Sequence, residues 1–181
     1  MRDGYKKIFW GMFFSTFHIN LGSIEILPNF IGLLIICSGI KEILKEYKYE
    51  SFEQALKYIS IHAVISFIAF VSPFIGLATL FENNIGLSII WFNIGNILEM
   101  FGIAKLLEGS AEILSERLIC NDESMEYRSK IDKYILIYSI IIVLSNINFI
   151  FMGSMTTVII AIVALITKIW IMFSLKKLSK Y

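Results

Sequence analysis

Long apolar runs with few interruptions dominate the chain. A helix that crosses a bilayer needs about 20 largely apolar residues, and the gaps between charged residues show where such helices fit. This pattern predicts six membrane-spanning helices, over residues 7–24, 28–46, 57–80, 84–106, 133–151 and 155–175. Short turns join them in pairs. The expected fold is therefore an all-α, polytopic membrane helix bundle of three hairpins, forming a single integral membrane domain over residues 1–181.

The basic residues test this topology, because cytoplasmic loops of membrane proteins carry an excess of Lys and Arg. Six crossings place both termini and the connections at 47–56 and 107–132 on one side. Almost every Lys and Arg lies there or at the adjoining helix ends, whereas the opposite turns at 25–27, 81–83 and 152–154 contain none. The distribution predicts a multi-pass protein of the cell membrane with both termini in the cytoplasm.

Residues 107–126 make up most of the longest connection. Leu107, Ala111, Leu114 and Leu118 recur there at helical spacing, with Glu and Arg on the other face. This cytoplasmic amphipathic segment either extends the fourth helix beyond the membrane or lies flat on the membrane surface.

Composition supports a bilayer environment and narrows the function. The chain is 57% hydrophobic and 17% charged, with a mean hydropathy of +0.74, which is too much apolar surface for a soluble protein of this size. The net charge of +1 and the lack of a basic patch argue against nucleic acid as a partner. Cys37 and Cys120 fit no metal-binding spacing, and no common catalytic motif is present. The sequence thus predicts no metal and no other cofactor, and it favours a non-enzymatic role without deciding the question.

Polar residues interrupt the first predicted hairpin in the stretch Ile19–Phe30, INLGSIEILPNF. We expect this stretch to form the outer turn of that hairpin. Glu25 is then either a solvated carboxylate at the membrane surface or a carboxylate sunk among helix ends beside His18, Asn20 and Asn29. In the second case these residues form a candidate ligand-binding or cation-binding site, because a carboxylate held in hydrocarbon usually has a function.

The fourth predicted helix carries Asn93, Asn96 and Glu99, which recur every three residues. Unsatisfied amides are costly at mid-membrane, so Asn93 and Asn96 either hydrogen-bond to neighbouring helices or line a ligand cavity. Glu99 and Lys168 are predicted at a similar depth, and we expect them to form a buried ion pair. His62 is predicted near the cytoplasmic end of the third helix, where a lone histidine is more often incidental than catalytic.

The segment INLGSIEILPNFIGLLIICSGIKEI, residues 19–43, resembles the start of small multi-pass membrane proteins from low-GC Gram-positive bacteria, through its N-L-G and I-L-P-x-F-I-G runs. This resemblance implies no particular activity. In size and topology the predicted bundle is similar to the substrate-binding subunits of energy-coupling-factor vitamin transporters, an analogy at the level of architecture. Those subunits typically show an Ala-x-x-x-Ala face on the first helix, where this chain has Gly11 and Ser15.

Two functions fit these observations. The first is a small-molecule-binding or transport component. The alternative is an accessory or regulatory subunit of a larger membrane complex, in which the small and polar residues mainly mediate helix packing. An intramembrane enzyme ranks below both. The expected partners are the lipid bilayer, an unknown small ligand and a membrane-protein partner subunit.

Overall fold

Six α-helices and a short β-hairpin make up the described part of the chain. The computed structural model describes residues 1–17, 20–21, 24–25, 28–77, 79, 84–116, 121–151 and 154–180. The elements are, in order, α1 (Arg2–Thr16), β1 (Asn20–Leu21), β2 (Ile24–Glu25), α2 (Asn29–Leu44), α3 (Glu50–Val71), α5 (Ile85–Glu116), α6 (Asn121–Phe151), α7 (Ser154–Lys177) and the 3-10 turn η1 (Leu178–Lys180). The all-helical class is confirmed, apart from the hairpin.

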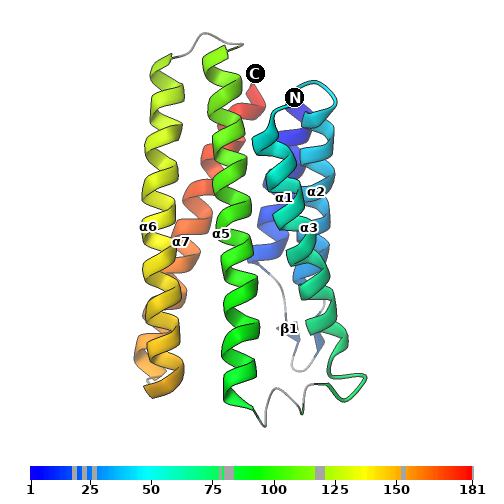
Figure 1. Cartoon of the computed structure of the whole chain (residues 1–181), viewed down its shortest axis with the longest axis vertical. Coiled ribbons are helices and arrows are strands. Elements are labelled where there is room, and N and C mark those ends of the chain that lie inside the picture. Colours follow the sequence, from blue (N-terminus) through cyan, green and yellow to red (C-terminus); the bar gives the residue numbers. More distant parts are fainter. Residues whose placement is uncertain are drawn as a thin grey trace.

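The helices close into a ring. Each helix packs against the next one along the chain, and α7 packs back against α1 (Figure 1). Both termini and the connection between α2 and α3 lie at one end of the bundle, which we call the terminal end, and β1 lies toward the opposite end, the far end. Packing of each helix against the next is the arrangement expected for the predicted series of three hairpins.

Among the described residues, four helices are long and apolar enough to cross a membrane: Glu50–Val71, Ile85–Glu116, Ser124–Asn148 and Thr156–Lys180. The helices α1 and α2 contain only 15 and 16 residues. At a rise of 1.5 Å per residue they measure about 22 and 24 Å, which is less than the ~30 Å hydrocarbon core of a bilayer. The structure is therefore consistent with a membrane protein that has four candidate spans, and the count of six stays a prediction.

The first helix is shorter than the sequence predicted. The expected helix covers residues 7–24, but α1 ends at Thr16. Beyond it, β1 and β2 pair as antiparallel strands, with Asn20 opposite Glu25. Two residues separate the strands, the length of the tightest hairpin connections. The apolar run continues through both helix and hairpin, so hydrophobicity alone did not reveal where the helix stops.

The third helix is displaced toward the terminal end. It covers Glu50–Val71 rather than the predicted 57–80. Glu50 and Glu53 lie in its first turn, where carboxylates interact favourably with the helix dipole. The helix ends shortly before Pro73, which lacks the backbone N–H that a continuing helix needs.

The described residues of the amphipathic segment 107–126 belong to two helices, and residues 117–120, with Leu118, lie outside the described structure. The helix α5 continues without a break to Glu116, so residues 107–116 extend the fourth predicted helix and do not lie flat on a membrane. Residues 121–126 start α6, which the sequence predicted only from residue 133. The apolar side of the extension is buried in the bundle core, at Leu107, Ala111 and Leu114. That burial is the reason this segment stays with the bundle.

Glycines bring α1 and α2 into close contact. A Cβ atom at Gly11 would lie 2.7 Å from the carbonyl oxygen of Gly32, and one at Gly39 would lie 2.6 Å from the carbonyl oxygen of Gly4. The two glycines on each helix are seven residues apart, so both pairs fall along one antiparallel contact. Ser15 also faces this contact, since a Cβ at Gly32 would lie 2.5 Å from its backbone nitrogen. The small residues Gly11 and Ser15 therefore serve the contact between α1 and α2 within this chain.

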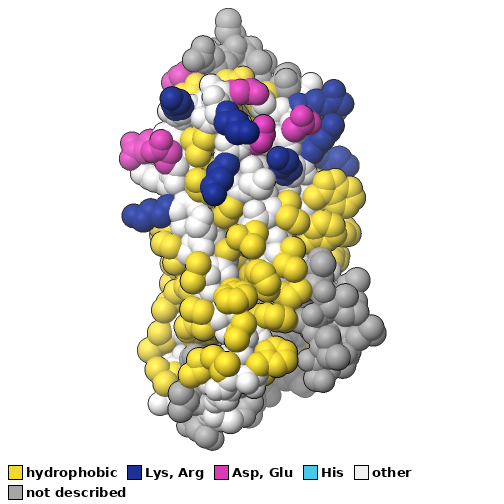
Figure 2. Space-filling view, turned by 90° about the vertical axis from the view of Figure 1, so that its right-hand side faces the viewer, with side chains coloured by type: hydrophobic (Ala, Val, Ile, Leu, Met, Phe, Trp, Pro, Cys, Tyr) yellow, Lys and Arg dark blue, Asp and Glu magenta, His cyan; other side chains and the backbone are white. Residues whose placement is uncertain are grey.

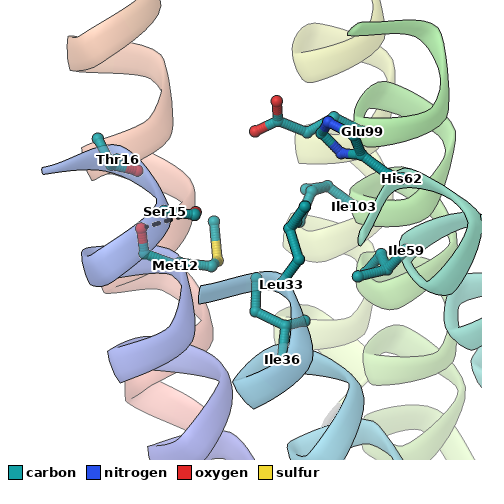
Figure 3. A pocket seen from close by; sticks show the side chains of 9 residues that line it. All are labelled: Met12, Ser15, Thr16, Leu33, Ile36, Ile59, His62, Glu99 and Ile103. Atoms are coloured by element: carbon teal, nitrogen blue, oxygen red, sulfur yellow. Dashed lines mark hydrogen bonds between the residues drawn. The ribbon is translucent and has the colours of Figure 1, made fainter. Parts of the chain in front are cut away.

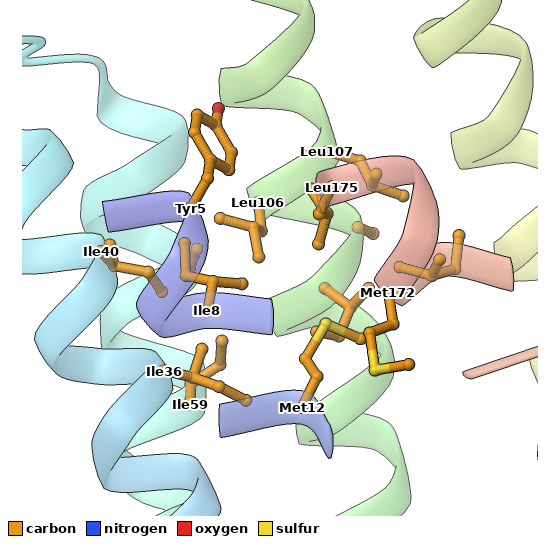
Figure 4. Packing of buried hydrophobic residues seen from close by; sticks show 14 of the residues in the cluster. Tyr5, Ile8, Met12, Ile36, Ile40, Ile59, Leu106, Leu107, Met172 and Leu175 are labelled. Carbon is orange, nitrogen blue, oxygen red and sulfur yellow. The ribbon is translucent and has the colours of Figure 1, made fainter. Parts of the chain in front are cut away.

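The buried core lies in the terminal half of the bundle. Apart from Ser72 at its C-cap, the buried residues of α3 run from Ser51 to Ala63, and those of α5 run from Met100 to Leu114. Side chains from α1, α5 and α7 meet at the centre, among them Tyr5, Ile8, Met12, Leu106, Met172 and Leu175 (Figure 4). A hydrogen bond joins α1 to α5 at this centre, where the Tyr5 hydroxyl donates to the Ser110 hydroxyl oxygen at 2.8 Å.

Apolar side chains cover the outside of the bundle below the terminal end. Figure 2 shows charged side chains gathered at that end and hydrophobic side chains over the surface beneath them. Phe74, Ile85 and Ile159 are 78%, 61% and 59% exposed. A water-soluble monomer rarely exposes so much contiguous apolar surface, so this band is suited to lipid.

Gly32→Ala tests the contact between α1 and α2. The added methyl group would meet the Ser15 nitrogen and the Gly11 oxygen at 2.5 and 2.7 Å, and we expect this overpacking to cost about 1–3 kcal/mol of unfolding free energy. Unfolding in detergent micelles, followed by circular dichroism, measures the loss. Gly86→Ala is the control, because its Cβ would meet only the Asn84 side-chain oxygen, at 3.4 Å. Equal stability of the two variants would contradict the close contact.

Candidate functional site

The N-terminal candidates fall largely outside the described structure. His18 lies outside the described residues, as do the side chains of Asn20 and Glu25. Asn29 is described, and its Nδ2 donates a hydrogen bond to Ser66 Oγ at 3.3 Å, linking α2 to α3. Asn29 thus has a structural partner, and both interpretations of Glu25 stay open.

Asn93 and Asn96 have different partners. Asn93 and Asn146 of α6 exchange two side-chain hydrogen bonds, with nitrogen–oxygen distances of 2.7 and 2.8 Å. Asn96 Nδ2 donates to the carbonyl oxygen of Phe92 on its own helix, at 2.8 Å. The reciprocal pair satisfies both amides in apolar surroundings, so helix packing accounts for Asn93. A ligand role for Asn96 stays a prediction.

Glu99 and Lys168 form a largely buried ion pair between α5 and α7. Lys168 Nζ lies 2.7 Å from Glu99 Oε1, and the two side chains are 23% and 16% exposed, respectively. Each residue lies about 21 Å along its helix from the far-end residue, Ile85 or Ser154, at 1.5 Å per residue. This equal depth is what the spacing of charges along the sequence indicated, and the expected pair is present in the structure.

Tyr138 of α6 joins this ion pair. Its hydroxyl group interacts with the Glu99 carboxylate, and its side chain is buried against Tyr134, with ring centres 5.2 Å apart. Two other helices therefore contribute polar groups to the surroundings of the carboxylate. A buried ion pair is tolerated only when its geometry is good and its surroundings compensate the lost water, and Tyr138 is part of those surroundings.

His62 is buried inside the bundle rather than near a helix end. It is 6% exposed, and it lies about 18 Å along α3 from Glu50, because that helix begins seven residues earlier than the sequence predicted. Its ring packs against α5, where a Cβ at Gly95 would lie 3.5 Å from Nε2. Within the described residues, no hydrogen-bond partner reaches its Nδ1 atom. The sequence had indicated an incidental histidine near the cytoplasmic end of the third helix, although the acidic residues Glu50 and Glu53 are typical of an earlier helix start.

A small cavity connects His62 and Glu99. Figure 3 shows their side chains beside each other, with Ser15 and Thr16 on α1 across from them. The other side chains that line the cavity are apolar: Met12, Leu33, Ile36, Ile59 and Ile103. The cavity volume is about 10 Å³, roughly what one water molecule needs. The Glu99 carboxylate and the His62 side chain thus line one small, mostly apolar cavity.

A second, larger hollow lies between α5, α6 and α7, nearer the far end. Its volume is about 250 Å³, and it is lined by Phe92, Ser145, Asn148, Thr157 and Ile160. Asn148 Nδ2 already donates to Thr157 Oγ1 at 2.6 Å. Because the Asn148 amide is engaged in this bond, the hollow is a weaker candidate for a specific polar site.

The four residues His62, Glu99, Tyr138 and Lys168 form what we call the polar cluster. Its carboxylate and imidazole accept protons, and its ammonium and phenol donate hydrogen bonds, so it suits the binding of a small polar or charged species. In the described ranges, no group of three His, Cys, Asp or Glu side chains could hold a metal ion.

No protein-family model matches the chain, and no curated protein or solved structure matches it either. The likeness of residues 19–43 to small bacterial membrane proteins stays an expectation from the sequence. The polar cluster is therefore the feature of the molecule that points to a function.

Lys168→Met tests the ion pair by leaving the Glu99 charge without its counter-ion. We expect the unfolding free energy to fall by about 3–5 kcal/mol, and the neutral double variant Glu99→Gln/Lys168→Met to recover most of this loss. Unfolding in detergent micelles measures both.

The matched control is Lys105→Met, which breaks the exposed Lys105–Glu108 pair, whose side chains are 31% and 44% exposed. Its cost should stay below about 1 kcal/mol. Equal costs for Lys105→Met and Lys168→Met would show that the Glu99–Lys168 pair behaves as a surface pair.

Proposed function

We propose that this protein is a membrane-embedded component that binds or transports a small polar molecule, and that the polar cluster is part of its binding site. The observation that carries this proposal is the Glu99–Lys168 ion pair beside the unpaired His62 nitrogen, inside an apolar bundle.

The energetics favour a functional reason for this cluster. Ionisable groups within a membrane are costly and usually mark a ligand, ion or proton pathway. Well-packed apolar residues of similar volume often stabilise a protein as well as a buried ion pair does. Helix packing alone therefore does not require charges between α5 and α7.

The cluster lies at the far-end boundary of the packed core. The buried residues of α5 begin at Met100, directly after Glu99. On the far side of this level, large side chains of the same helix are exposed, including Ile90 at 57% and Phe92 at 49%. The charged groups of the cluster therefore lie outside the most tightly packed part of α5.

The proposal includes six spans with both termini in the cytoplasm. The basic side chains at the terminal end support that orientation (Figure 2). In this arrangement α1 and α2 cross the bilayer together with the hairpin of β1 and β2. The hairpin supplies the length that the two short helices lack.

Cysteine labelling tests the six-span topology. In a chain with Cys37 and Cys120 replaced by Ala, Ser23→Cys should react in intact cells with a membrane-impermeant maleimide, because six spans place residue 23 outside. Asn83→Cys is the positive control at a predicted outer turn, and Lys48→Cys is the control for the cytoplasmic side. Labelling of Asn83→Cys without labelling of Ser23→Cys would show that the first hairpin does not cross.

Ligand retention tests the proposed function. The protein is purified in mild detergent from its native host, and retained small molecules are identified by mass spectrometry. We expect a polar small molecule to be retained by the wild-type protein and lost, by at least about tenfold, from Glu99→Gln/Lys168→Met. The variant Lys105→Met/Glu108→Gln, which removes an exposed pair, should retain it.

Equal retention by all three proteins would contradict a role of the polar cluster in binding. The same preparation addresses the alternative function. A stable membrane-protein partner that co-purifies in the absence of any retained small molecule would favour an accessory or regulatory subunit.

A further inference from the structure

The polar cluster contains a base that its ion pair leaves unused. His62 is 6% exposed, and within the described residues its Nδ1 atom has no hydrogen-bond partner. A buried polar atom without a partner is energetically costly, and such an atom in a native structure calls for an explanation. Proton binding by the imidazole is one such explanation. The cavity beside this ring has room for about one water molecule, through which a proton can reach the ring.

The surroundings of the imidazole hold one negative and one positive group. From α5, Glu99 lines the same cavity as His62. From α7, Lys168 reaches Glu99 by the 2.7 Å ion pair. From α6, Tyr138 interacts with the carboxylate, and its ring packs against that of Tyr134.

The two remaining neighbours of the cavity are α1 and α2. From α1, the hydroxyl-bearing residues Ser15 and Thr16 line the cavity, and Ser15 Oγ already donates to the Met12 carbonyl at 3.1 Å. From α2, the lining residues are apolar, and the Cys37 thiol is engaged with Ser60 Oγ of α3 at 3.5 Å. Glu99 is therefore the charged group that shares the cavity with the imidazole.

We propose that His62 is a proton-binding site at mid-depth in the bundle, and that Glu99 stabilises the resulting imidazolium in competition with Lys168. This proposal deepens the proposed function and rests on it, because it names the proton as a species that the polar cluster binds.

The proton balance is simple. One proton from solvent water adds to the lone pair of the neutral imidazole, and no bond of the protein breaks. The summed charge of His62, Glu99 and Lys168 rises from zero to +1. Two cations then share one carboxylate, so the attraction between Glu99 and Lys168 weakens. Proton binding on α3 is in this way linked to the contact between α5 and α7.

The test is a titration of the imidazole by NMR. The chain has two histidines, so full-length protein carrying His18→Gln and labelled with ¹⁵N-histidine reports on His62 alone. In lipid nanodiscs we expect its ring nitrogens to change from the neutral to the imidazolium chemical shifts between about pH 8 and pH 5, the range in which histidine commonly titrates.

Two variants distinguish a site controlled by Glu99 from an isolated histidine. Glu99→Gln/Lys168→Met removes the carboxylate that shares the cavity together with the more distant ammonium, so the titration midpoint should fall by at least about one pH unit, a tenfold weaker proton affinity. Lys105→Met/Glu108→Gln removes an exposed pair on the same helix and should leave the midpoint unchanged.

A His62 that stays neutral down to about pH 5, or one that titrates equally in the wild type and in Glu99→Gln/Lys168→Met, would overturn the proton-binding proposal. The measurement needs no small ligand, so its failure is separate from that of the proposed function. Retention of a small molecule with a neutral His62 would reject proton binding and leave the proposed function standing.

Discussion

Two pairs of glycines set the distance between α1 and α2, and the position of α1 decides how the helical ring closes. Because the two backbones touch at Gly11 and Gly32, α1 lies deep enough for Ile8 to reach the common core. The same placement lets α1 pack against α7. It also brings Ser15 to the cavity beside the polar cluster. A larger residue at these glycines would move one wall of that cavity.

The cost of charge in apolar surroundings governs the polar cluster. Glu99 and Lys168 come from different helices, so each helix alone would carry an uncompensated charge into the bundle. Pairing across α5 and α7, with Tyr138 from α6 as a further polar neighbour, reduces that cost only when the three helices are correctly placed. The cluster therefore couples a site for polar chemistry to the assembly of the bundle, and His62 is its member without a complete set of partners.

The candidate site was predictable to different degrees for particular residues. The pairing of Glu99 with Lys168 followed from depth, because both lie at similar distances from the ends of apolar runs. The hydrogen bonds between Asn93 and Asn146 could not be predicted from depth. Many amides at similar depth can pair, and the rotation of each helix about its axis selects which pair forms. His62 was placed wrongly because the start of α3 was set too late. The side chains of Asn20 and Glu25 lie outside the described residues, so their role stays a prediction.

The sequence by itself determined that this chain is helical and apolar enough for a membrane, and in what order its helices run. Those properties are local, since a run of apolar residues between charges has the same meaning whatever surrounds it. The tertiary structure decided that α1 stops at Thr16, that α5 continues to Glu116 against the core, and that His62 shares a cavity with Glu99. These features depend on which faces of the helices meet. Contact between faces depends on the shapes of both partners, which no single segment contains.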